Sequence, residues 1–199
     1  MKLKNLPSII EKNNFNEKGL VIVEQGFLVP VYVGSQQGFS SAEKNYLENN
    51  FYPELKKRGV LPLCPFTACA EYLNLSELND NTNLKEYTEF WERFNEIIGP
   101  VNYEILMPHS KFMIAIFDGG HACDDGLSAE VSYYASNFGS VIGIRSDFRL
   151  SENIAAPINP AIRYFLDKGP YKGKLFTGTT AYEDALNEIE KLANEIKNY

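Results

Sequence analysis

The sequence has few of the features that mark membrane, secreted or histidine-dependent catalytic proteins. Its 199 residues include three cysteines, two histidines and one tryptophan. No apolar run reaches the roughly 18 residues that a transmembrane helix requires. The N-terminal stretch MKLKNLPSIIEKNNF lacks the apolar core and the small-residue cleavage site of a secretory signal. We therefore expect a cytoplasmic protein without a membrane partner. The two histidines also give little support to Ser/His/Asp or Cys/His catalysis.

The chain also lacks a cluster of positive charge. It has 19 Lys and Arg residues against 26 Asp and Glu residues, which gives a net charge of −7 at pH 7. Proteins that bind nucleic-acid polymers need clustered cations to contact the phosphate backbone. The composition therefore argues against a nucleic-acid polymer as partner, and it favours a small neutral or cationic ligand.

The cysteines predict neither disulfides nor a metal site. Cys64, Cys69 and Cys123 are odd in number and form no CxxC pair, so we expect reduced thiols. His121, Cys123 and Asp124 lie close together in the sequence. However, a metal site needs three or four convergent ligands, and this spacing matches no zinc motif. We therefore expect no bound metal.

The order of apolar and amphipathic stretches predicts the fold class. No repeat or flexible linker divides the chain, so we expect one domain over residues 1–199, with residues 1–26 as an N-terminal extension that can supply a hairpin strand. Apolar runs alternate with amphipathic stretches, as in βαβ units. The predicted architecture is α/β, with a single doubly wound, mostly parallel five-stranded sheet in the flavodoxin-like order and helices on both faces.

Periodicity and turn residues place the individual elements. Strands are expected at residues 27–34, 60–66, 111–120, 140–148 and 173–178. Helices are expected at residues 40–59, 84–99, 126–139, 159–167 and 181–199, with a short helix within 101–110 and an irregular polar segment at 67–83. Sites in such sheets lie beyond the carboxyl ends of the strands. By this rule the loops after Gly34, Asp118 and Arg145 share a rim.

The stretch DDGLSAE, residues 124–130, stands where the central strand is followed by a helix. On a helical wheel Leu127, Val131 and Tyr134 form a buried stripe together with Phe138, and Glu130 lies at its border. We place Glu130 in the first helical turn, where free N–H groups and the helix dipole favour an ionised carboxylate. It could serve as a nucleophile or simply as an acid that caps the helix.

Four other groups of residues also allow two interpretations each. Asp124 and Asp125 can be turn and cap residues around a glycine, and Asp118 can be a turn former or a ligand for hydroxyl groups. The segment YVGSQQGFSSAE, residues 32–43, can hold an anion on its backbone amides or be an ordinary strand–helix turn. The aromatic residues at helical spacing favour a core over a stacking platform; they are Tyr87, Phe90, Trp91 and Phe94.

Taken together, these pieces resemble the nucleoside 2-deoxyribosyltransferase family. The run FMIAIFDGGHACDDGLSAEVSYYASNFGSVIGIRSDFR, residues 112–149, matches the family's order of strand, Asp-x-Gly-x-x-x-Glu, helix and apolar strand. The segment VYVGSQQGFSSAEKNYLENNFYPELKKRG is similar to the family's first βα unit, with its tyrosine at Tyr32 and its phenylalanine at Phe39. The resemblance covers residues 29–66 and 98–166.

The resemblance implies a double displacement at the anomeric carbon of a 2′-deoxynucleoside. Glu130 would attack C1′ and expel the base, and a second base would then attack the glycosyl ester. Asp124 would help to hold the sugar, Tyr32 would lie near the nucleophile, and Gly126 would let the backbone approach the sugar. No cofactor is implied. The full set of implied substrate-binding residues is Gly34, Ser35, Phe39, Asn102, Asp118, Gly126 and Asn159.

Other features of the family bear on specificity and assembly. The position of the family's base-side aspartate is taken by Tyr103, and Glu104 could replace that aspartate after a small shift. A related branch hydrolyses nucleoside 5′-monophosphates with a Gly-Ser turn, which Gly34 and Ser35 would supply. A cation near Ser35 would favour that hydrolase, and a non-catalytic nucleotide-binding module is a third possibility. The partners implied are nucleosides and nucleobases, in a homo-oligomer whose contacts come from residues 153–159.

Overall fold

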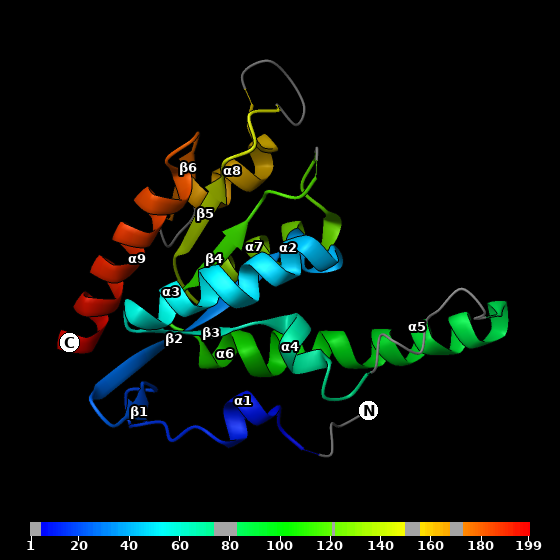
Figure 1. Ribbon diagram of the computed structural model, residues 1–199, viewed down its shortest axis with the longest axis horizontal. Helices are drawn as coiled ribbons and strands as arrows, with labels where there is room; N and C mark the ends of the chain where they lie inside the picture. The colour runs from blue at the N-terminus through cyan, green and yellow to red at the C-terminus, as the bar shows by residue number, and fades with distance from the viewer. Residues whose placement is uncertain (1–4, 74–82, 121, 150–155, 168–172) are drawn as a thin grey trace.

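Within the part of the chain that the structure describes, six strands form one sheet with helices on both faces (Figure 1). This computed structural model describes residues 5–73, 83–120, 122–149, 156–167 and 173–199, without the side chain of Phe39. The strands are β1 Val21–Val23, β2 Gly26–Ser35, β3 Val60–Leu63, β4 Met113–Ile116, β5 Val141–Arg145 and β6 Lys174–Thr177. The helices are α1 Ser8–Glu11, η1 Gln36–Phe39, α2 Ser41–Tyr46, η2 Leu47–Phe51, α3 Tyr52–Lys57, α4 Pro65–Cys69, α5 Leu84–Gly99, η4 Pro100–Leu106, α6 Met107–His109, α7 Asp125–Asn137, α8 Pro160–Asp167 and α9 Ala181–Asn198.

The strand order confirms the predicted fold class. Strands β3, β2, β4, β5 and β6 are neighbours in that order and run parallel, which is the flavodoxin-like arrangement. The antiparallel strand β1 pairs with the start of β2 and is the hairpin partner expected within residues 19–25. Strand β2 therefore has three partners along its length, and β4 lies at the centre of the sheet as expected.

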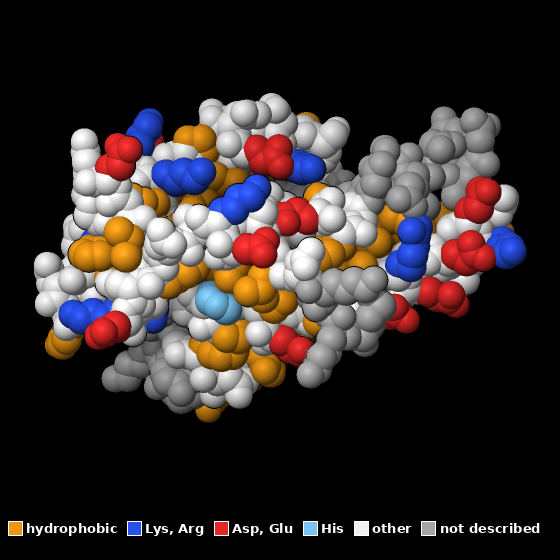
Figure 2. All heavy atoms as spheres, turned by 90° about the horizontal axis from the view of Figure 1, so that it is seen from below, with side chains coloured by type: hydrophobic (Ala, Val, Ile, Leu, Met, Phe, Trp, Pro, Cys, Tyr) orange, Lys and Arg blue, Asp and Glu red, His pale blue; other side chains and the backbone are white. Residues whose placement is uncertain are grey.

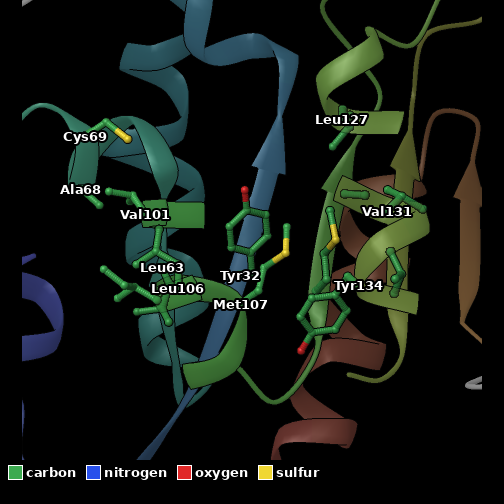
Figure 3. Close-up of a cluster of buried hydrophobic side chains, with 14 of the residues drawn as sticks. Tyr32, Leu63, Ala68, Cys69, Val101, Leu106, Met107, Leu127, Val131 and Tyr134 are labelled. Carbon is green, nitrogen blue, oxygen red and sulfur yellow. The ribbon is translucent and has the colours of Figure 1, made fainter. Parts of the chain in front are cut away.

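The alternation of side chains along β2 separates two hydrophobic cores. Val29, Val31 and Val33 face η2, α3 and α9. Tyr32 faces the opposite side, where it packs with residues of α4, η4 and α7 (Figure 3). Because successive side chains of a strand point to opposite faces, one strand contributes to both cores.

Two helical runs contain π-helical turns, and each of these turns adjoins a proline. The helix expected at 40–59 is the continuous run α2–η2–α3, capped by Ser40 and followed by Gly59, whose φ is +79°. The helices expected at 84–99 and within 101–110 also form one run, α5–η4–α6. Pro53 and Pro100 have no N–H group to donate within the helix, so the backbone widens locally instead of ending.

Some predicted boundaries were wrong. Residues 67–69, expected to be irregular, belong to α4, because Pro65 starts a helix directly after β3; residues 74–82 of that segment lie outside the described residues. Tyr87 is 46% exposed, although Phe90 beside it is buried as predicted. The reason is that α5 extends beyond the sheet (Figure 1), and its outer end carries acidic and basic side chains (Figure 2).

No helix in the described segments combines the length and the apolar character that crossing a bilayer demands.

Candidate active site

A cavity of about 310 Å³ opens beyond the carboxyl end of β2. This is the edge of the sheet where parallel α/β folds place their ligands. The end of β2, the start of α7 and the turn η4 form its polar side, and α4 and α5 form an apolar side. The residues that line the cavity include Ser35, Gly38, Lys44, Phe66, Cys69, Ala70, Leu73, Phe94, Ile98, Asn102, Tyr103, Asp124, Gly126, Leu127 and Glu130.

Glu130 is partly buried in this cavity, at the border of the buried stripe of α7. Leu127, Val131 and Tyr134 of that stripe are buried as predicted, and Phe138 is only partly buried. Helix α7 begins at Asp125, so Glu130 lies in the second turn, and its expected place in the first turn was wrong. The free N–H groups of the helix start therefore do not stabilise its charge.

A close approach of α7 to β2 fixes the Glu130 carboxylate. A Cβ atom added to Gly34 would lie 2.8 Å from Glu130 Oε2 and 2.8 Å from Leu127 Cδ1. Such contacts are closer than carbon atoms tolerate, so Gly34 is the glycine that makes room for the acid. The expected role of Gly126 has less support, because a Cβ atom there would meet only Asp124 Oδ1, at 3.1 Å.

Burial controls the protonation of Glu130. Desolvation raises its pKa, and so does the nearby charge of Asp124, while polar contacts with Tyr32 and Asn102 partly oppose the rise. The net result is a pKa of about 7. The expected ionised carboxylate is therefore only partly populated near neutral pH, where the protonated and ionised forms coexist. The cause is that α7 places the acid in a desolvated position rather than at a helix end.

Tyr32 lies beside the acid on β2. Its hydroxyl points toward the carboxyl end of the strand, between Cys69 and Leu127 (Figure 3). Burial, followed by the negative charge of Glu130, raises the pKa of Tyr32 well above its ordinary value, so the phenol stays protonated. The hydroxyl approaches Glu130 without completing a hydrogen bond, and it has no partner among the described residues.

Asn102 is the second polar neighbour of the acid. Its Nδ2 donates a hydrogen bond of 2.9 Å to Glu130 Oε1, and its side chain is 2% exposed. The π-helical turn η4 carries Asn102 and Tyr103 to the cavity. Asn102 Oδ1 has no partner within the described residues, although it is buried. Glu104 is exposed and does not line the cavity, so it does not take the place of a base-side acid.

Asp124 is both a helix cap and a residue that lines the cavity. Its Oδ1 accepts a hydrogen bond of 2.7 Å from Leu127 N, so it is the N-cap of α7, and it also lines the cavity. Its backbone N–H donates to Gln36 Oε1 at 2.9 Å. Gln36 Nε2 donates in turn to the carbonyl oxygens of Phe117 and Ala122. No sequence pattern assigns Gln36 this bridging role, because only its tertiary contacts create it.

Asp118 and Asn159 do not reach the cavity. Both oxygens of Asp118 accept hydrogen bonds, from Ser146 N and Oγ and from Asp147 N, at 2.7–3.0 Å. Asp118 therefore holds the loop after β5 and does not line the cavity. Asn159 Oδ1 accepts a hydrogen bond of 2.8 Å from Ala161 N at the start of α8. The expected contact region 153–159 falls partly outside the described residues, which resume at 156.

The turn after β2 brings a cation to the same cavity. Ser35 Oγ accepts a hydrogen bond of 3.1 Å from Gln37 N and caps η1. Lys44 of α2 lines the cavity together with Ser35 and Gly38. Its nearest carboxylate is Glu48, with Nζ and Oε1 3.7 Å apart. Phe39 belongs to η1, but its side chain is outside the description.

The cysteines are free thiols, and none of them joins a possible metal cluster in the described part of the chain. Cys64 and Cys69 are buried, and Cys123 is partly buried. In the described ranges, which exclude His121, no three His, Cys, Asp or Glu side chains are grouped in a way that could hold a metal. His121 itself, one of the residues considered above, lies outside those ranges.

Comparison with known proteins supports the fold class. No family model and no curated protein matches the sequence. A conserved protein from Enterococcus faecalis is similar in structure, with a TM-score of 0.53 and 14% sequence identity over 83% of this chain and 99% of that one. A 2-desoxiribosyltransferase from Leishmania mexicana gives a TM-score of 0.43 and 16% identity over 82% of this chain and 97% of that one. At such identities the likeness concerns the α/β fold, not the activity.

The tight contact at Gly34 gives a first prediction. Gly34→Ala should lower the free energy of unfolding by about 1 kcal/mol, because its methyl group would overlap the ends of the Glu130, Leu127 and Met113 side chains, which must shift. Gly99→Ala is the control: its added methyl group meets nothing within 4 Å, so up to about 1 kcal/mol of stabilisation is expected from helix propensity. Urea unfolding of both variants measures the difference, and equal effects would contradict the close packing at Gly34.

The raised pKa of Glu130 gives a second prediction. Between its unfolded pKa, about 4.3, and its folded pKa, about 7, the folded state keeps a proton that the unfolded chain has lost, so its ionisation lowers stability as the pH rises. Glu130→Gln cannot ionise. Its free energy of unfolding should exceed that of the wild type at pH 8 by about 3–4 kcal/mol, and the gain should vanish near pH 4.

The control for this measurement is Glu89→Gln, because Glu89 is an exposed carboxylate on α5. It should change the free energy of unfolding little at either pH. If Glu130→Gln is no more stable than the wild type at pH 8, the acid is not desolvated in solution.

Proposed function

We propose that this protein transfers a 2-deoxyribosyl group between nucleobases through a covalent intermediate on Glu130. The observation that carries the proposal is the seating of this single acid against Gly34, Tyr32 and Asn102 at a cavity. Desolvating a carboxylate costs free energy that an exposed helix acid would avoid. Acids in such positions are candidates for catalysis.

In the first half-reaction, the ionised Glu130 attacks C1′ of the bound deoxynucleoside. The C1′–N bond breaks, its electron pair leaves with the base, and the base nitrogen takes up one proton from water. The product is a glycosyl ester between Glu130 and the sugar, with inversion at C1′. The raised pKa makes the carboxylate a stronger base, and hence a better nucleophile, than an exposed glutamate.

In the second half-reaction, a nitrogen of the incoming base attacks C1′ from the face that the first base left. The ester bond breaks, Glu130 departs as a carboxylate, and the attacking base gives up one proton. The exchange is therefore neutral in protons and retains the configuration at C1′. Asn102 holds one oxygen of Glu130, so the other oxygen is the one that attacks. Tyr32 supplies a protonated hydroxyl beside it.

Asp124, with Gly126 beside it at the cavity, would bind the sugar hydroxyls. We also propose that residues 1–199 act as one domain that uses no cofactor, works in the cytoplasm on nucleosides and nucleobases, and forms homo-oligomers.

The first functional test is base exchange. Purified protein with 2′-deoxyinosine and free adenine should produce 2′-deoxyadenosine, detected by chromatography. Glu130→Ala should abolish this product, because no other group forms the ester in the proposed reaction. Denaturing mass spectrometry of the wild-type protein with substrate alone should reveal the mass of one added deoxyribosyl group.

The control variant is Glu43→Ala, which removes an acid from the first turn of α2 without touching the lining of the cavity. Exchange that persists in Glu130→Ala would refute the assignment of the nucleophile. Absence of turnover on every nucleoside and nucleotide would favour the non-catalytic nucleotide-binding module.

Lys44 favours a second candidate, an N-glycosidase that hydrolyses (deoxy)nucleoside 5′-monophosphates. A phosphate needs a cation and hydrogen-bond donors, and Lys44 lines the cavity with Ser35 at the end of β2. In this reaction water replaces the second base, so the products are the free base and the sugar phosphate. The same Glu130 would act in both reactions.

Lys44 therefore gives a prediction that separates the two candidates. If the substrate is a monophosphate, Lys44→Met should lower kcat/KM for deoxynucleoside 5′-monophosphates at least tenfold, because one charge-assisted contact is lost. The matched control is Lys57→Met on α3, whose side chain is 74% exposed. Steady-state assays with nucleosides and their monophosphates measure both variants. If Lys44→Met lowers kcat/KM equally for both substrates, Lys44 does not bind the phosphate.

A further inference from the structure

The candidate cavity has two chemically different sides. Its acid, amide and hydroxyl groups come from β2, η4 and α7, as described above. In Figure 3, Leu127 of α7 lies on one side of Tyr32, and Cys69 of α4 lies on the other side. The described lining on that side, from α4 and α5, is apolar; its main members are Phe66, Cys69, Ala70, Leu73, Phe94 and Ile98.

This apolar wall is already formed without a ligand. A Cβ atom at Gly38 would lie 2.1 Å from Phe66 Cε2, so the turn η1 packs directly on the Phe66 ring. Cys69 and Leu73 are each 5% exposed. Burial raises the pKa of Cys69 to about 12, so this thiol stays protonated and behaves as a small apolar group. A preformed wall requires little ordering when a ligand binds, so less affinity is lost.

We propose that the α4–α5 wall is a subsite for an alkyl or aryl substituent on the nucleobase. This rests on the proposed function, since it assigns a substrate class to the same site. With the sugar at Glu130, the base extends from C1′ toward the side of the cavity that the acid does not occupy. An unmodified base would place polar edges against this wall and lose hydration there. An apolar substituent gains about fourfold in binding for each methylene group that it buries. The preferred substrates are therefore nucleosides or nucleotides of alkylated or arylated bases.

The test compares matched substrates that differ only in the substituent. One pair is 2′-deoxyadenosine and its N6-benzyl derivative, and the other is 2′-deoxyuridine and its 5-propyl derivative. Each is assayed as nucleoside and as 5′-monophosphate. At least one pair should show a kcat/KM at least tenfold higher for the substituted member. The dissociation constants, measured by calorimetry on Glu130→Gln to avoid turnover, should show the same preference.

Two variants test whether the wall is the cause. Ala70→Phe fills the subsite from an exposed position, so folding should survive, and Ile98→Gln makes the wall polar. Each should reduce the ratio of kcat/KM between substituted and unsubstituted substrates to about one. Ala70→Ser, which adds almost no volume, should keep that ratio.

The outcomes separate this inference from the proposed function. If unmodified substrates of both pairs react as well as the substituted ones, the subsite is refuted while the transferase or hydrolase function stands. The subsite is also refuted if a preference exists but survives in both Ala70→Phe and Ile98→Gln. If no nucleoside or nucleotide reacts or binds, the proposed function and the subsite both fail.

Discussion

The packing of α7 on β2 at Gly34 is the contact on which the rest of the site depends. It brings a helix carboxylate against the backbone of a strand, where a side chain larger than hydrogen would displace it. This position removes water from Glu130 and raises its pKa to about 7. The same contact places the acid beside Tyr32 and within hydrogen-bonding distance of Asn102. Geometry and electrostatics at the site thus have one physical origin.

The surrounding scaffold holds this contact in place. Gln36 ties the start of α7 to the end of β4 through hydrogen bonds to the backbone at Phe117, Ala122 and Asp124. Asp118 holds the loop after β5. A π-helical turn beginning at Pro100 presents Asn102 to the acid. Gln36 and Asp118 thereby satisfy polar groups at the rim of the sheet.

In the proposed function the two sides of the cavity would have different tasks. The acid, amide and hydroxyl groups gather on the side of β2, η4 and α7, where buried polar atoms strengthen one another's fields. The α4–α5 side offers an apolar surface, which would suit the alkyl or aryl substituent proposed above. Lys44 stands at the rim near Ser35, in a chain whose net charge is −7. A local cation therefore attracts an anionic ligand that the protein as a whole repels.

The sequence by itself determined the α/β class, the strand order, the buried stripe of α7 and the identity of Glu130 as a candidate, because these follow from periodicity, turn residues and local motif spacing. The burial of Glu130, the role of Gly34, the bridging by Gln36 and the exposure of Tyr87 depended on the tertiary structure. Each results from contacts between segments far apart in the chain. Desolvation is set by which distant surfaces close over a side chain, and no local pattern encodes that.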